Sequence, residues 1–172
     1  MRFKHLLITC TAMLLALAVV APGVAAGKAG GTDRPVKGTL SGSTTTDTAT
    51  GLGTGQGTGN ISHLGKVTYT QNLTATVTGP TTVALSGTGT LVAANGDQVF
   101  YTFTGTATPP SLVPAVGQTI PVTFDTTITG GTGRFADASG TVTTTGQAVI
   151  VSVAGTTFSS RDTTTLEGRI SY

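Results

Sequence analysis

Residues 83–105 read VALSGTGTLVAANGDQVFYTFTG and predict a β-hairpin. Apolar and small residues alternate with polar ones up to the turn Asn95-Gly96-Asp97, and the alternation resumes after it. An Asn-Gly pair between two alternating runs is a strong signal for a tight hairpin turn. The residues expected on the apolar face of the hairpin are Val83, Leu85, Gly87, Gly89, Leu91, Ala93, Val99, Tyr101, Phe103 and Gly105.

The same alternation extends along the chain in both directions from this hairpin. It recurs in residues 36–42, 64–77, 120–128, 142–150 and 166–172. No stretch of the mature chain shows apolar residues at the spacing of a helix. Seven or eight strands joined by short turns indicate an all-β sandwich or barrel.

Two features favour a single closed, antiparallel β-barrel of about eight strands over residues 36–172. The first is the recurrence of glycine on the apolar faces, for example at Gly38 and Gly146. Glycine weakens a strand, so its repeated use indicates either a strongly coiled sheet or room inside a barrel. The second is the strand 166–172, which is expected to pair with residues 36–42 and so remove both sheet edges.

The glycine-rich run 51–59, GLGTGQGTG, is interpreted as a flexible loop at the rim of this barrel. Phosphate binding is not expected at the later glycine cluster Gly131-Thr132-Gly133. That cluster lacks the third glycine and the Lys-Ser/Thr pair of nucleotide-binding loops, and no long helix follows it.

Residues 1–26 have the layout of a secretory signal peptide. A basic head precedes a short apolar run, and Val24-Ala25-Ala26 provides a small-residue exit. The apolar run is too short for a comfortable membrane span, and the mature chain contains no other, so no transmembrane segment is expected there. We therefore predict secretion, with cleavage after Ala26 and a flexible segment over residues 27–35.

Charge and cysteine content say little about function once the signal is removed. The chain has nine Lys and Arg residues, of which Arg2 and Lys4 lie in the signal, so the remaining bases balance the seven acids. No basic surface for nucleic acid is implied by this balance. The only cysteine, Cys10, also leaves with the signal. The exported domain is therefore expected to be stable without disulfides.

Residues 130–140, GGTGRFADASG, resemble a family signature. They match the pattern G-G-T-G-x-F-x-x-A-x-G of the allene oxide cyclase-like and dirigent-like eight-stranded barrels, which include small secreted bacterial proteins. With the strand order, the resemblance spans about Val36 to Tyr172. It implies a barrel interior that acts as a pocket for a reactive substrate, and assembly of family members as dimers or trimers. A homo-oligomer is accordingly among the expectations. In the motif, Phe135 is expected to tuck under one end of the barrel.

Residues that could carry chemistry are few, and no catalytic residue is assigned. His63 is the only mature histidine, so neither a multi-histidine metal site nor a serine triad with its usual G-x-S-x-G turn is supported. No metal or other cofactor is expected. Of the acidic residues, Asp125 is expected to face outward, and Glu167 and Arg169 are interpreted as a surface pair. Four more lie in turns or in the tail, namely Asp33, Asp47, Asp97 and Asp137.

Tyr101 and Phe103 are the candidate ligand-binding residues, because both are expected to point into the barrel. For Tyr101 the alternative is a core tyrosine with a satisfied hydroxyl. Three functions remain open: non-catalytic binding of a small apolar ligand or a partner, a cyclase- or isomerase-like enzyme, and a structural protein of the cell envelope. A wide cavity would favour the first two. A charged side chain inside it would favour the enzyme over simple binding.

Overall fold

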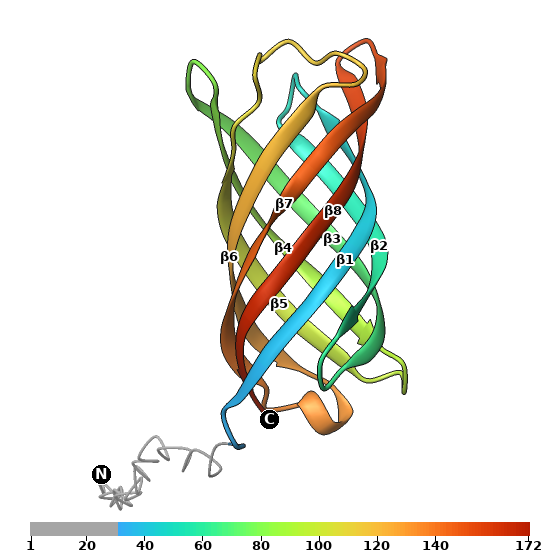
Figure 1. Ribbon diagram of the computed structural model, residues 1–172, viewed down its shortest axis with the longest axis vertical. Coiled ribbons are helices and arrows are strands. Elements are labelled where there is room, and N and C mark those ends of the chain that lie inside the picture. The colour runs from blue at the N-terminus through green and yellow to red at the C-terminus, as the bar shows by residue number, and fades with distance from the viewer. Residues whose placement is uncertain (1–30) are drawn as a thin grey trace, which may run out of the picture.

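The alternating runs form eight strands in the computed structural model, which describes residues 31–172 (Figure 1). Each strand is antiparallel to the next, and the last pairs with the first, so the sheet closes into one barrel. The predicted signal peptide and its cleavage site lie outside the described residues. The strands are β1 (Arg34–Asp47), β2 (Leu52–Ile61), β3 (Gly65–Gly79), β4 (Thr82–Ala93), β5 (Gln98–Ala107), β6 (Thr119–Gly131), β7 (Ser139–Ala154) and β8 (Thr157–Ser171).

Closure through the chain's first and last described strands is confirmed. The pairing of β1 with β8 runs from Arg34 opposite Ile170 to Asp47 opposite Thr157. Every strand therefore has a hydrogen-bonded neighbour on both sides, and the barrel has no open edge. Because β1 begins at Arg34, the end of the segment 27–35 belongs to the barrel wall.

The interpretation of residues 51–59 as a loop is wrong. Residues 52–61 form β2, which pairs with β1 on one side and β3 on the other. Its glycines face the interior and its threonines face solvent, so the strand has the usual period of two, but Ile61 at its end is the only side chain that it contributes to the core. Backbone hydrogen bonds to both neighbouring strands hold β2 in place. These bonds do not depend on the side chains, so the hydropathy of the sequence does not predict them.

The barrel has two apolar clusters, one toward each end. The larger includes the fully buried Val67, Val99 and Ile170 and lies near the short 3-10 helix η1 (Gly133–Phe135). The smaller contains Ala107, Ile120, Val122 and Ile150, near the connection between β5 and β6. In Figure 1, η1 and the C-terminus lie at one end of the barrel and the β5–β6 connection lies at the other. Between the two clusters the inner wall carries polar side chains.

The glycine-rich motif closes the η1 end, as predicted for Phe135. The Phe135 side chain is 0% exposed and makes an edge-to-face contact with Tyr172, with ring centroids 4.9 Å apart. The Arg134 guanidinium lies 4.6 Å from the Phe135 ring centroid and donates a hydrogen bond to the backbone oxygen of His63. Gly133 has a φ of +56°, a left-handed conformation that glycine adopts without strain.

Candidate functional site

The barrel encloses a cavity of about 370 Å³, which is the candidate functional site. Aliphatic and aromatic side chains make up most of its lining. The lining reaches the β5–β6 connection, where Val77 and Leu112 both border the cavity and remain exposed to solvent, at 61% and 39%. The mouth of the cavity therefore lies at this end, while the motif around Phe135 closes the other.

Inward-facing glycines create much of this space. On β2, the inward positions before Ile61 are all glycine, namely Gly53, Gly55, Gly57 and Gly59. Aromatic rings from neighbouring strands lie over two of the inward-facing glycines, Gly57 on β2 and Gly89 on β4. A Cβ atom at Gly57 would collide with the Tyr69 ring, and one at Gly89 would collide with Tyr101. The inward glycines thus provide room, as expected: they let the rings of Tyr69 and Tyr101 lie close to the barrel wall.

Both sequence-derived candidates, Tyr101 and Phe103, lie on the inner wall and line the cavity. The Tyr101 hydroxyl donates a hydrogen bond to Oε1 of Gln71 at 3.3 Å. Phe103 makes an edge-to-face contact with Phe124, with ring centroids 5.4 Å apart. Tyr101 thus has the satisfied hydroxyl of a core tyrosine and still borders the cavity. A role for the pair in ligand binding stays a prediction.

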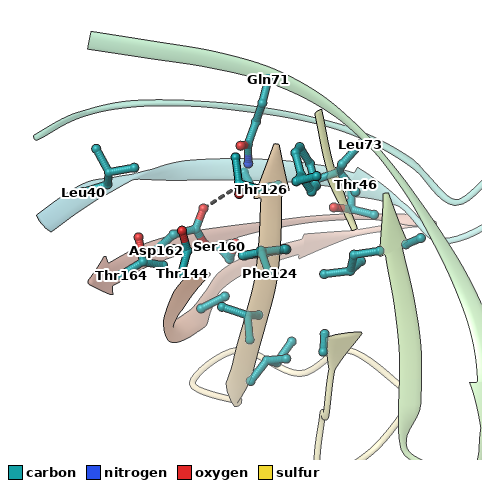
Figure 2. A pocket seen from close by; sticks show the side chains of 18 of the residues that line it. Leu40, Thr46, Gln71, Leu73, Phe124, Thr126, Thr144, Ser160, Asp162 and Thr164 are labelled. Atoms are coloured by element: carbon teal, nitrogen blue, oxygen red, sulfur yellow. Dashed lines mark hydrogen bonds between the residues drawn. The ribbon is translucent and has the colours of Figure 1, made fainter. Parts of the chain in front are cut away.

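A carboxylate that hydropathy alternation does not reveal also lies inside the barrel. Asp162 on β8 lines the cavity (Figure 2). Its Oδ2 accepts a hydrogen bond from the Thr44 hydroxyl at 2.5 Å, and its Oδ1 accepts one from the Ser160 hydroxyl at 2.7 Å. Further polar atoms on the inner wall come from the amide of Gln71 and from the hydroxyls of Thr46, Thr126, Thr144 and Thr164. The apolar cavity therefore contains a belt of polar groups centred on one acid.

Two tyrosine hydroxyls near this belt are held in their neutral form. Burial, with a smaller contribution from the negative charge of Asp162, raises the pKa of Tyr69 to about 12. Burial and the neighbouring Tyr69 raise the pKa of Tyr101 well above its usual value. At neutral pH both phenols can therefore donate hydrogen bonds, and neither supplies a charge.

The remaining titratable residues named from the sequence lie outside the cavity. His63 occupies an exposed turn with a φ of +68°, and its Nε2 lies 3.1 Å from the backbone oxygen of Pro35. Asp125 faces outward as expected and accepts a hydrogen bond from Thr143. Among residues 31–172, no cluster of His, Cys, Asp or Glu could hold a metal ion.

The surface pair expected between Glu167 and Arg169 does not form as such. Glu167 pairs with Lys37 of the neighbouring strand at 3.3 Å, and Arg169 pairs with Asp33. Glu167 and Arg169 lie two residues apart on β8 and therefore share a face of the sheet. Charged residues on or next to the neighbouring strand β1 share that face too, and each of the two forms its ion pair with one of these. All four side chains are exposed, so these pairs bear on the outer surface and not on the cavity.

Comparison of the chain with protein-family models, with curated proteins and with solved structures finds no match. Within the described part of the chain, no helix has the length and apolar character needed to span a membrane. The structure shows the eight-stranded barrel, while membership of the allene oxide cyclase-like family stays a prediction from residues 130–140. Any function for this protein has to be argued from the cavity itself.

Proposed function

We propose that this protein is a secreted binding module that holds a small, mostly apolar ligand inside its barrel. The cavity of about 370 Å³ carries this proposal. Ligand pockets typically have volumes of about 300–1,000 Å³ and combine an apolar lining with a few polar groups. An interior packed with side chains would instead favour a structural role. The resemblance of residues 130–140 to pocket-forming barrels supports the same choice.

Filling the cavity should weaken the binding of an uncharged apolar probe. N-phenyl-1-naphthylamine, whose fluorescence rises in apolar surroundings, should bind the wild-type protein. Ala148 faces the cavity, so Ala148→Phe places a ring inside it and should weaken probe affinity by about tenfold or more, equivalent to about 1.4 kcal/mol. The neighbouring Gln147 is exposed on the outer face, and Gln147→Phe should leave the affinity unchanged within about twofold.

Circular dichroism and thermal unfolding should accompany both variants. If Ala148→Phe does not fold, Ala75→Phe tests the same point from β3, because Ala75 also lines the cavity. Equal loss of fluorescence in the inward and outward variants would contradict the proposal, as would the absence of probe binding by the wild-type protein.

The inward carboxylate favours a second function, a cyclase- or isomerase-like enzyme. Asp162 could move a proton to or from a bound substrate, since a carboxyl group in an apolar cavity is suited to acid–base catalysis. Small molecules extracted from the purified protein provide a test. Incubated with fresh wild-type protein and analysed by liquid chromatography and mass spectrometry, they should yield an isomer of unchanged mass that Asp162→Asn does not form. Recovery of the same molecules unchanged would support binding without turnover.

A further inference from the structure

The position of Asp162 gives its carboxylate direct access to the cavity. Its neighbour across β1 is Gly42 and its neighbour across β7 is Ala148, so neither flanking strand covers it with a large side chain. The hydroxyls of Thr44 and Ser160 each donate one hydrogen bond to it. An ionised carboxylate can accept about four hydrogen bonds, so capacity remains on the side that faces the cavity. Figure 2 shows the side chain on the wall beside Ser160.

This carboxylate has no cation partner among the described residues. The cavity lining contains no Lys, Arg or His side chain within residues 31–172. The ion pairs of Asp33, Asp97 and Glu167 involve residues that do not line the cavity. Arg161 is adjacent in sequence, but strand alternation directs it to the opposite face of β8. The two hydroxyls supply dipoles without a compensating positive charge, and an enclosed carboxylate without a counter-charge is costly.

Aromatic side chains complete a lining suited to a cation. The Tyr69 hydroxyl lies against Gly42, the residue opposite Asp162, and so lies on the wall beside the carboxylate. Tyr101, Phe103 and Phe124 contribute further rings to the cavity lining. The face of an aromatic ring attracts an ammonium group, and this attraction strengthens where water is excluded. A carboxylate beside the Tyr69 hydroxyl, in a cavity lined by further aromatic rings, therefore favours a ligand cation and disfavours a ligand anion.

We propose that the ligand of this barrel carries a protonated amine on an apolar body, with the ammonium group against Asp162 and the body along the apolar wall. This inference rests on the proposed binding function and specifies the ligand's chemical class. It distinguishes the protein from a carrier of fatty acids or other apolar anions, because a ligand carboxylate would be repelled by Asp162. The ligand would supply the positive charge that the chain does not place inside the barrel.

Three probes with the same chain length and different head groups test this inference. Octylamine, octan-1-ol and octanoate are titrated at pH 7 against the protein loaded with N-phenyl-1-naphthylamine, and displacement is followed by fluorescence. Wild-type protein should bind octylamine at least about tenfold more tightly than octanol, because the ammonium group forms an ion pair with the Asp162 carboxylate, whereas the octanol hydroxyl supplies only a hydrogen bond. Octanoate should bind most weakly of the three.

Two matched substitutions locate the effect. Asp162→Asn keeps the size of the side chain and should remove the advantage of octylamine over octanol. Asp125→Asn makes the same change on the outer face and should preserve the wild-type order. The inference is overturned if octylamine and octanol bind the wild-type protein alike, or if the preference survives in Asp162→Asn.

The outcomes separate this inference from the function on which it rests. If the fluorescent probe does not bind wild-type protein, the binding function itself is wrong. If the probe binds but the octylamine preference is absent, only the amine assignment is wrong. The order of the three ligands on the unchanged protein remains decisive even if Asp162→Asn does not fold.

Discussion

Replacing Phe135 with alanine is expected to lower the free energy of unfolding by about 3–5 kcal/mol. The ring is fully buried at the closed end of the barrel, in contact with the Tyr172 ring and the Arg134 guanidinium. Removing it leaves a cavity under the main apolar cluster, and the surrounding strands cannot collapse into that space without breaking the sheet's pairing. Equilibrium unfolding in guanidinium chloride, followed by circular dichroism, measures the change.

Phe100→Ala provides the matched control for this prediction. Phe100 lies on the outer face of β5 and is 37% exposed, so its removal should cost much less than that of Phe135. A change below about 0.5 kcal/mol for Phe135→Ala would show that the ring does not contribute to closing the barrel. The motif at residues 130–140 would then have no role in sealing this end of the barrel.

The sequence was sufficient to predict the barrel because the turn and strand patterns of its segments agree with the closure of the whole sheet. The hairpin around Asn95-Gly96-Asp97 follows from turn chemistry, and the inward faces of most strands follow from a period of two. Pairing of residues 36–42 with residues 166–172 follows from the need to cover two exposed sheet edges. The hairpin, the inward faces and the pairing of the first and last strands are confirmed, although residues 36–42 lie opposite residues 162–168. Each of these features depends on the backbone and on hydropathy, which can be read from the sequence.

Strand β2 could not be predicted in the same way. Between Leu52 and Ile61 its inward positions are glycine and its outward positions are polar, so no alternation of apolar and polar side chains marks it as a strand. A glycine-rich polar segment in isolation does behave as a flexible linker. In the barrel, hydrogen bonds to β1 and β3 and the neighbouring side chains that lie over its glycines, among them the Tyr69 ring at Gly57, compensate for the missing side chains. The strand is specified by its neighbours, and this is tertiary information.

The inward position of Asp162 was not predicted for a different reason. The sequence of β8 does contain a local signal for it. The inward face of β8 contains Leu166, Gly168 and Ile170, and the same alternation extended toward the N-terminus places Thr164, Asp162 and Ser160 on that face. A polar run gives no reason to extend an apolar face, so hydropathy predicts this strand only from Leu166 onward. Counting the period of two through the polar residues places the carboxylate inside the barrel.

The inward glycines themselves lead to the second large effect on stability. Gly57→Val is expected to destabilise the protein by about 3 kcal/mol, at the upper end of the usual cost of overpacking a core. A Cβ atom at this position would meet the backbone of Ser41 and Gly42 on one side and the Tyr69 ring on the other. Backbone atoms of a paired strand cannot move aside as a flexible side chain can, so the added bulk must strain the β1–β2 pairing or displace Tyr69.

Thermal and denaturant unfolding of Gly57→Val should be compared with Thr58→Val, which changes the adjacent, exposed position on the same strand. Valine is favourable in strands, so the control should remain within about 0.5 kcal/mol of wild type. The contrast between the two isolates the lack of space inside the barrel from any general intolerance of β2 to substitution. Similar stabilities for both variants would mean that the β2 glycines are not required for the close approach of Tyr69. The width of the cavity, and the place of Tyr69 beside Asp162, would then need a cause other than these glycines.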